Sequence, residues 1–559
     1  MMDRSNVEAT HSTRRAGRAG LVVFVILFAA AGTVGFLWSK KTPPSQASAQ
    51  TGSPDAARST KAREANARNP DTTTTLPPVV DGWSVPAFCL AITGQQHGYI
   101  EPCGCSPKQS GGLARRADLF RQLREDKKWP VLALETGGTL SEARVTRRQS
   151  VLKFDMILDA LNGMDYKVLG LGTEELKLTP TRLFEIFSNR NAQQGFDLPF
   201  VAANVVLLSS TELGTPQLFR ILEVGGKKVA VTSIFGNDFK GEFFLISPDE
   251  LKITDPLVAL PPVLAAMKAE KPDVLVLLSY DGPEGSRALA EKFPELDVVV
   301  AAAGADDPGD DHETIGKTLF FVSGMKGKHV NLVGFYPGEK VPVRFERVEL
   351  DQDRFQRSPK MRELMTAYQE RLKEEWLTPT SDLRVLKYAH SSGYQFMGAK
   401  ACAGCHASAY KVWEGSSHAN ATNHLFTGRN DEKEPWIDRT YDPECLACHA
   451  TGWDAREAIP YVDGFIDAQS TPHLLGNQCE NCHGPASEHV KLETDWKAAG
   501  GPLSDALTTS RNSLHITKAQ AEKKLCFTCH DHDNSPHFKF EDYWPQIEHP
   551  TPASEKPKK

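Results

Sequence analysis

CAGCH at Cys402–His406 is the first of four Cys-x-x-Cys-His pentads in this chain of 559 residues. The other three are CLACH at Cys445–His449, CENCH at Cys479–His483 and CFTCH at Cys526–His530. Two thiols three positions apart can form thioether bonds to the two vinyl groups of one haem, and the adjacent imidazole can then bind the iron. The pentads therefore predict four covalently bound c-type haems.

The pentads supply the candidate attachment and ligand residues. The expected attachment thiols are Cys402, Cys405, Cys445, Cys448, Cys479, Cys482, Cys526 and Cys529, and the expected proximal ligands are His406, His449, His483 and His530. Paired Cys-x-x-Cys motifs also form zinc ribbons. A zinc ribbon does not require a histidine directly after the second cysteine, and this chain also carries an export signal, so haem is favoured over zinc or disulfides.

An uncharged apolar run covers residues 19–38, and a helix of that length spans the hydrocarbon core of a bilayer. Arg14, Arg15 and Arg18 precede the run, which predicts a cytoplasmic segment 1–18 and export of everything that follows. A cleaved signal peptide is the alternative, with Ala47–Ala49 as a small-residue site far beyond the apolar run. An uncleaved anchor on the periplasmic side of the inner membrane is favoured.

The composition is that of a soluble globular protein, with 40% hydrophobic residues, 24% charged residues and a net charge of −7. The length predicts two or three domains. No basic tract suggests nucleic-acid binding. Residues 39–84 are rich in Pro, Ser, Thr and Ala and are expected to be a flexible tether.

An α/β domain is expected over residues 85–352, because short β-rich runs alternate with helical stretches. The expected strands are Phe88–Ile92, Val131–Leu134, Lys167–Leu171, Phe200–Ala202, Lys228–Ile234, Val274–Leu278, Val298–Ala302 and Leu319–Val322. The expected helices are Leu113–Leu123, Ser150–Leu161, Pro180–Phe187 and Pro262–Ala269. Several strands are continuous apolar runs, as expected when both faces of a sheet are covered.

The remaining chain divides into three segments. Residues 353–387 are expected to be a helical linker, because Lys360–Leu377 has the apolar spacing of an amphipathic helix. Residues 388–550 are poor in strand signals and rich in Cys, His, Gly and Pro, as expected for a tetrahaem domain, and residues 551–559 form a tail.

Three segments of the haem region resemble the cytochrome c-554 family of tetrahaem electron carriers. They are MGAKACAGCHASAYKVWEGSSHA, YDPECLACHATGW and NQCENCHGPASEHV, and the similarity covers about residues 395–550. The resemblance implies a mainly helical fold with mostly bis-histidine iron, one haem often being five-coordinate. On that basis His418, His489 and His549 are the expected distal ligands, with His390 and His473 as weaker candidates.

Residues 85–350 resemble the 5′-nucleotidase branch of the metallophosphoesterases. The segments AITGQQHGYIEP, ALETGGTL, LGLGTEEL, PFVAANV, LLSYDG and VVVAAAGADD occupy the places of that family's motifs. The family needs two metal ions held by Asp, Asn and His. Of the ligand positions only His97 fits; the others carry Gln95, Gly138, Thr173, Glu174, Tyr280, Ala305 and Asp307. The expectation is a retained fold without the dinuclear metal site.

Three cysteines lie outside the pentads, at Cys89, Cys103 and Cys105. A bridge from Cys89 to Cys103 or Cys105 is one expectation, and metal or redox chemistry at Cys103 and Cys105 is the other. Gly111 and Gly112 precede a helix with Arg115 and Arg116, an arrangement that can hold an anion.

The favoured function is a membrane-anchored periplasmic tetrahaem cytochrome that carries electrons, with the α/β domain as a docking or regulatory module. Such a protein is more an electron carrier than a catalyst. Its expected partners are redox proteins or membrane quinol-linked donors. Three alternatives remain open: a haem-based oxidoreductase acting on a small nitrogen or sulfur compound at a five-coordinate haem, a 5′-nucleotidase-like hydrolase fused to a cytochrome, and thiol redox chemistry.

Overall fold

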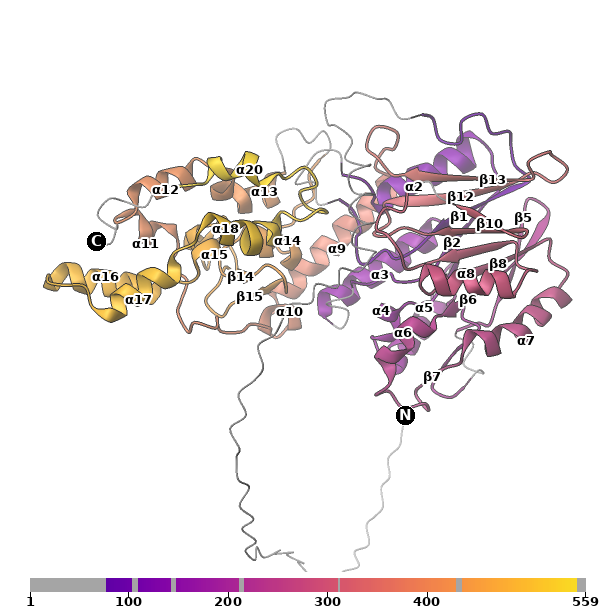
Figure 1. Cartoon of the computed structure of the whole chain (residues 1–559), viewed down its shortest axis with the longest axis horizontal. Helices are drawn as coiled ribbons and strands as arrows, with labels where there is room; N and C mark the ends of the chain where they lie inside the picture. The colour runs from indigo at the N-terminus through magenta and orange to yellow at the C-terminus, as the bar shows by residue number, and fades with distance from the viewer. Residues whose placement is uncertain are drawn as a thin grey trace, which may run out of the picture. The chain divides into compact units, whose positions relative to one another are not determined.

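Two β-sheets form the amino-terminal half of the structure and pack face to face (Figure 1). The computed structural model describes residues 77–102, 109–141, 147–210, 216–309, 312–428 and 435–549. The first sheet has the order β13-β12-β1-β2-β3, in which β1, β2 and β3 are parallel and β12 and β13 antiparallel to their neighbours. Its strands are β1 Phe88–Thr93, β2 Val131–Glu135, β3 Tyr166–Leu169, β12 His329–Phe335 and β13 Val343–Glu349.

The second sheet has the order β10-β11-β9-β8-β6-β5. Its four inner strands are parallel, and the two edge strands β5 and β10 are antiparallel to their neighbours. Its strands are β5 Arg220–Val224, β6 Lys227–Phe235, β8 Val274–Tyr280, β9 Val298–Ala301, β10 Glu313–Ile315 and β11 Thr318–Val322, and a separate pair joins β4 Val205–Leu207 to β7 Leu251–Ile253.

Alternate residues of each inner strand enter different cores, as the twofold periodicity of a strand requires. In β1, Phe88 and Leu90 face the second sheet, whereas Cys89 and Ala91 face the helices that cover the first sheet. Both faces are therefore buried, which explains why these strands appear in the sequence as unbroken apolar runs.

Helices cover the two outer faces of this sandwich. Side chains of α2, α3, α5 and α9 pack against the first sheet, and side chains of α7 and α8 pack against the second. The helices of this half are α2 Leu113–Arg121, continued by a π-helical turn Gln122–Asp126, α3 Arg148–Gly163, α4 Thr173–Leu176, α5 Pro180–Asn191, α6 Asn237–Lys240, α7 Pro256–Ala269 and α8 Pro283–Lys292.

Most of the predicted elements are confirmed to within a few residues, including β1, β2, β6, β8, β9 and β11 and the helices α2, α3 and α5. Helix α7 begins six residues earlier than predicted, at Pro256. The strand predicted at Phe200–Ala202 is wrong, since Phe200 and Val201 form only isolated bridges. Strands β12 and β13 were not predicted, because buried polar residues interrupt their apolar pattern: Asn331 donates to the carbonyl oxygens of Ile92 and Ser323 and accepts from Arg347.

Helix α9 (Pro359–Leu377) is the predicted linker helix, and it belongs to two cores. It starts with Ser358 at the N-cap and Pro359 in the first turn, where a missing amide hydrogen costs nothing. Its Met365 and Leu372 pack in the core of the α/β half. Its Trp376 is fully buried, stacks on Trp453 at 5.6 Å and belongs to the core of the carboxyl-terminal half. Side chains of one helix therefore belong to the cores of both halves.

The carboxyl-terminal half consists of short helices and one small apolar core. Its helices are α10 Asp382–Val385, α11 Ala399–Ala403, α12 Ala407–Glu414, α13 Ala421–Thr427, α14 Pro443–His449, α15 Cys479–His483, α16 Ser487–Ala499, α17 Asp505–Leu514, α18 Lys518–Gln520, α19 Phe527–Cys529 and α20 Phe540–Tyr543, with one hairpin, β14 Trp453–Asp454 and β15 Ile459–Pro460. The core is formed by Trp376, Phe396, Leu425, Leu446, Ala447, Ala450, Trp453, Ala458, Phe465 and Leu474.

The predicted cytoplasmic segment 1–18, the apolar run 19–38, most of the tether 39–84 and the tail 551–559 lie outside the described residues. Within the part of the chain that is described, no helix combines the length and the apolar character needed to cross a bilayer.

Candidate haem sites

Each pentad forms a helical turn that brings its two thiols and its imidazole to one side. The amide of His406 donates to the carbonyl of Cys402 at 2.9 Å, and His530 donates to Cys526 at the same distance. The second and third pentads lie within α14 and α15. Positions i, i+3 and i+4 share a helix face, so the predicted attachment thiols and proximal histidine of each pentad lie on the same face.

Three of the pentad imidazoles lie opposite the three predicted distal histidines. The ring centres are 6.3 Å apart for His406 and His489, 6.0 Å for His530 and His418, and 5.8 Å for His483 and His549. Two imidazoles bound on opposite sides of one metal ion, each with its nitrogen about 2 Å from the metal, have ring centres about 6 Å apart. The spacing of all three pairs therefore fits one iron between the rings.

Hydrogen bonds at Nδ1 set which nitrogen of the pentad imidazoles is available for a metal. His449 Nδ1 lies 2.8 Å from the carbonyl oxygen of Ala421, and His483 Nδ1 lies 2.6 Å from that of Leu514. A carbonyl can only accept, so both Nδ1 atoms carry the proton and donate. Nε2 is then the basic nitrogen, which is the arrangement that metal-binding histidines commonly have.

Burial lowers the pKa of several of these imidazoles and favours the neutral form, which is the form that binds a metal. For His418 and His489 burial is the main cause, with weaker effects from neighbouring histidines and charged side chains. The same cause lowers the pKa of His483 and His549, and it lowers that of His530 to about 4.

The pentads are grouped two by two. The side chains of Cys402 and Cys479 interact, which raises the pKa of Cys402 and lowers that of Cys479, and this contact groups the first pentad with the third. An interaction with Cys529 raises the pKa of Cys448 and groups the second pentad with the fourth.

The histidines follow the same grouping. His406 influences the pKa of His483, His489 and His549, and these four form what we call the 406/483 cluster. His449 influences the pKa of His418 and His530, and these three form the 449/530 cluster.

The two weaker distal candidates lie in other surroundings. His390 is half-buried, and its ring makes edge contacts with Phe396 and Tyr461. His473 is exposed, and its carbonyl accepts a hydrogen bond from the side chain of Gln478.

In the α/β half, three residues at the former metal-ligand positions form one hydrogen-bonded group. Tyr280 donates from its hydroxyl to Glu174 Oε2 at 2.8 Å, and His97 Nδ1 lies 3.3 Å from Glu174 Oε1. Gly138 packs beside them, since a Cβ added there would lie 3.2 Å from the ring of Tyr280. Asp307 lies elsewhere, 3.5 Å from His329 Nε2. Among the described residues, no three His, Cys, Asp or Glu side chains are grouped to hold a metal ion.

The charge state of this group follows from its hydrogen bonds. Burial acts to raise the pKa of Glu174, but the bonds from His97 and Tyr280 keep that pKa below its ordinary value. Burial and the neighbouring Glu174 raise the pKa of Tyr280 far above its usual range. At neutral pH Glu174 is therefore a carboxylate whose two oxygens already face a phenol and an imidazole.

The two arginines considered for anion binding are buried structural groups. Arg115 donates to the carbonyl oxygens of Gln109 and Leu350, and Arg116 donates to the side chain of Gln96 and lies 3.7 Å from the carboxylate of Glu135. Both guanidinium groups are therefore engaged within the protein, and anion binding at the Gly111–Gly112 turn stays a prediction. The pKa of Glu135 is raised to about 7 by burial, which the charge of Arg116 partly offsets.

Of the three cysteines outside the pentads, the structure describes Cys89. Cys89 is fully buried in β1 with a free thiol, and burial raises its pKa to about 12. The expected bridge from Cys89 is therefore not formed. Cys103 and Cys105 lie outside the described residues.

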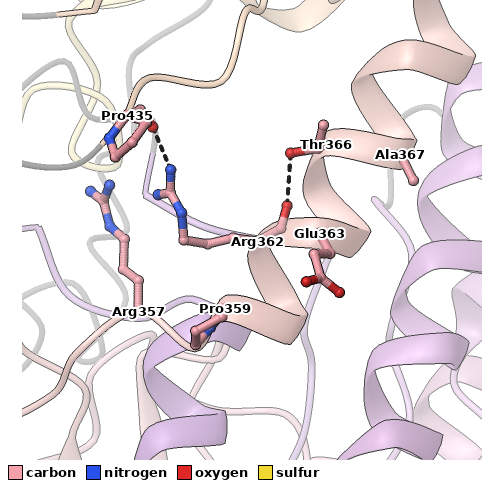
Figure 2. A pocket seen from close by; sticks show the side chains of 7 residues that line it. All are labelled: Arg357, Pro359, Arg362, Glu363, Thr366, Ala367 and Pro435. Carbon is pink, nitrogen blue, oxygen red and sulfur yellow. Dashed lines mark hydrogen bonds between the residues drawn. The ribbon is translucent and has the colours of Figure 1, made fainter.

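The sequence did not predict the polar contacts between the two halves. Asp442, the N-cap of α14, accepts hydrogen bonds from Gln149 of α3 at 2.7 Å and Gln369 of α9 at 2.8 Å. An open hollow of the surface lies beside the start of α9, where Arg362 donates to the carbonyl oxygen of Pro435 (Figure 2). Only distances in space could reveal these contacts, because their partners are far apart in the sequence.

Comparison with known proteins agrees with both halves of this description. Residues 401–484 match the family model "Cytochrome c554 and c-prime". Cytochrome c-554 of Nitrosomonas europaea is 27% identical over 154 residues, which cover 25% of this chain and 60% of that protein. The 5′-nucleotidase of Bos taurus is 26% identical over 251 residues, which cover 43% of this chain and 42% of that protein.

Among solved structures, the 5′-nucleotidase precursor of Thermus thermophilus is similar, with a TM-score of 0.44 and 19% identity over 52% of this chain and 60% of that one. The chain spans less than two thirds of the length of each of these proteins. Both resemblances expected from the motifs are confirmed: the chain joins a region similar to 5′-nucleotidases to a region that matches the cytochrome c554 family, which binds c-type haem covalently.

Proposed function

We propose that this protein carries electrons through four covalently bound c-type haems in its carboxyl-terminal half. The three imidazole pairs carry the proposal, because each joins a pentad histidine to a histidine from outside the pentads at the spacing expected across one iron. When bound, iron with an imidazole on each face supplies one-electron transfer and leaves no position for a substrate.

The residues of this chain have distinct tasks toward these haems. The eight pentad cysteines named above would anchor them, and His406, His449, His483 and His530 would be proximal ligands. His489 would complete the site of His406, His418 that of His530, and His549 that of His483. The carbonyls of Ala421 and Leu514 orient His449 and His483 by holding their Nδ1 protons.

The α/β half serves, in this proposal, as a docking or regulatory module and not as a phosphoesterase. Two-metal hydrolysis needs several carboxylate and imidazole ligands around a shared centre. Here the oxygens of Glu174 face His97 and Tyr280, and a glycine and a threonine stand at two further positions.

The proposed location is the periplasmic side of the inner membrane, with residues 19–38 as the anchor and the following Pro-rich and Ser-rich segment as a tether. Redox proteins or quinol-linked donors in the membrane would exchange electrons with the haems. Covalent attachment of haem fits this location, because c-type cytochromes are matured after export.

The decisive experiment combines a haem count with electron paramagnetic resonance of the oxidised protein. Four haems per chain by the pyridine haemochrome assay, and low-spin signals from the three paired sites, are expected. The same spectrum reports the coordination of the iron at His449.

Fewer than four haems would contradict the proposal. A high-spin ferric signal would instead favour a haem-based oxidoreductase, provided that the same haem binds CO or NO when reduced and turns over a small nitrogen or sulfur compound. Phosphatase activity with added divalent metal ions would instead support the alternative of a 5′-nucleotidase-like hydrolase fused to a cytochrome.

A further inference from the structure

The carboxylate of Asp533 lies between two lysines of the α/β half. Lys328 Nζ is 2.7 Å from Asp533 Oδ1, and Lys326 Nζ binds Asp533 Oδ2. Asp533 is 21% exposed, Lys326 28% and Lys328 13%, so water screens these charges less than it screens a surface pair. Burial acts to raise the pKa of Asp533, but Lys328 and Lys326 hold it below its ordinary value. Asp533 is therefore a carboxylate at neutral pH.

Asp533 belongs to the loop that orients a pentad imidazole. It follows His530 by three residues, and in the same loop Ser535 donates its amide to the carbonyl of Asp531 at 2.8 Å. The hydroxyl of Ser535 lies 3.0 Å from His530 Nδ1. A displacement of Asp533 would therefore move the short loop whose Ser535 hydroxyl contacts His530, and so change the orientation of the His530 ring.

A third lysine makes the equivalent contact at the second pentad. Lys153 Nζ, on α3, binds the carboxylate of Glu444, which directly precedes Cys445. The same ammonium donates to the carbonyl oxygen of Gly98 at 3.0 Å. The lysine is 11% exposed. Among the described residues, ammonium groups of the α/β half thus reach the second and fourth pentads, which hold His449 and His530 of the 449/530 cluster.

Lys153 and Lys326 also donate hydrogen bonds to the turn that contains His97. Lys153 binds the carbonyl of Gly98, and the amide of Lys326 donates to the carbonyl of Gln95 at 2.7 Å. Gln95 and His97 have φ values of 48° and 47°, a conformation that residues other than glycine keep only when their surroundings hold it. The two bridging lysines therefore contact both the former metal site and the haem-bearing loops.

We propose that Lys153, Lys326 and Lys328 are positioning residues that set the reduction potentials of the haems held at His449 and His530. The proposal rests on the proposed function, since it requires those haems. A positive charge near the iron stabilises the reduced state, which carries one positive charge fewer, and a carboxylate stabilises the oxidised state. Lys326 Nζ also lies 3.7 Å from the carboxylate of Asp306. Each ammonium group beside His530 therefore raises the potential of the haem there, and each carboxylate lowers it.

Opposite substitutions in this ion triad provide the test. Lys326→Gln with Lys328→Gln leaves Asp533 uncompensated and is expected to lower the midpoint potential of the haem at His530. Asp533→Asn leaves the two ammonium groups and is expected to raise it. Each change should alter the ratio of reduced to oxidised haem at a fixed potential about threefold to tenfold, tenfold being 59 mV for a one-electron couple. Lys268→Gln is the matched control, because Lys268 pairs with Glu295 on the exposed face of α7.

The readout is a potentiometric titration followed by electron paramagnetic resonance, with the haem count of each variant measured alongside. Shifts in the same direction for both variants, or shifts no larger than that of Lys268→Gln, would overturn the proposal. If the lysine double variant does not assemble, Asp533→Asn and Lys153→Gln still decide, the latter with an expected lower potential at His449. Fewer than four haems in the unmutated protein would contradict the proposed function instead.

Discussion

The two halves of this molecule reach a buried interior by different means. The α/β half packs its own side chains into continuous cores between and outside its two sheets. The carboxyl-terminal half has one small apolar cluster, and its pentad thiols and imidazoles are gathered into two groups. A region with so little apolar surface of its own is marginal without a further apolar group. The side chains of the α/β half are therefore sufficient to form its core, whereas we expect haem to complete the core of the carboxyl-terminal half.

The largest effect is expected when the cofactor is withheld. Production in a host without cytochrome c maturation should leave residues 388–549 largely unprotected against amide hydrogen exchange, while β1, β8 and β9 stay protected, because only the sheets have a complete core of their own. Hydrogen exchange with mass spectrometry measures both halves in one sample. Equal protection of both halves in the haem-free protein would contradict the comparison.

Removing the side chain that joins the two cores should have the next largest effect. Trp376→Ala is expected to cost about 3–5 kcal/mol of unfolding free energy, because this indole is fully buried against Trp453. Thermal unfolding of the haem-loaded protein should then separate into two transitions. Leu377→Ala, at the half-exposed neighbouring position, is the control and should keep the transition unchanged. A single unshifted transition in Trp376→Ala would show that the halves are not coupled through α9.

Exchanging one distal ligand should change one haem and leave the α/β half untouched. His418→Met is expected to raise the reduction potential of the haem at His530, because a thioether ligand favours reduced iron. The ratio of reduced to oxidised haem at a fixed potential should rise at least tenfold, which corresponds to about 1.4 kcal/mol. Optical redox titration measures the shift. His390→Met is the matched control, because the half-buried ring of His390 packs on Phe396 and Tyr461. An unchanged spectrum and potential would remove His418 from the ligand set.

The smallest expected effect lies in the former metal site. The pKa of Glu174 is lowered in the folded protein, so its ionised form stabilises the fold above the unfolded value of about 4.3, and this contribution is lost as the pH falls through the folded pKa. Glu174→Gln should therefore cost about 1–2 kcal/mol near pH 7 and less as the solution is acidified to about pH 3. Denaturant unfolding at several pH values measures this. A difference that grows on acidification would have the wrong sign.

The pentads and the distal histidines show which features of the haem sites can be predicted from local sequence. The Cys-x-x-Cys-His spacing is local chemistry, and a helical turn presents it in the same way wherever the turn lies. The distal histidines were predicted individually, but their partners were not. Of the four pentad histidines, His406 is nearest to His418 in the sequence, yet the ring of His418 lies 6.0 Å from that of His530 in the last pentad. Pairing depends on how distant helices pack, and no local pattern encodes that.

The α/β half makes the same point in its sheets and its former metal site. Buried apolar strands were found from their composition, whereas β12 was missed because its buried Asn331 is satisfied only by partners from other strands. The loss of metal ligands could be predicted from residue types. The hydrogen-bonded group of His97, Glu174 and Tyr280 could not, because it requires three separate segments to meet.

Residue identity and short spacing were enough to predict the haem-attachment motifs, the order of the two halves and the incomplete set of metal ligands at the phosphoesterase positions. Three features could be learned only from the packed chain: which histidines face each other, that α9 belongs to both cores, and that Lys153, Lys326 and Lys328 bind carboxylates beside the second and fourth pentads. These features are contacts between residues far apart in the chain, and such contacts exist only once the chain has packed.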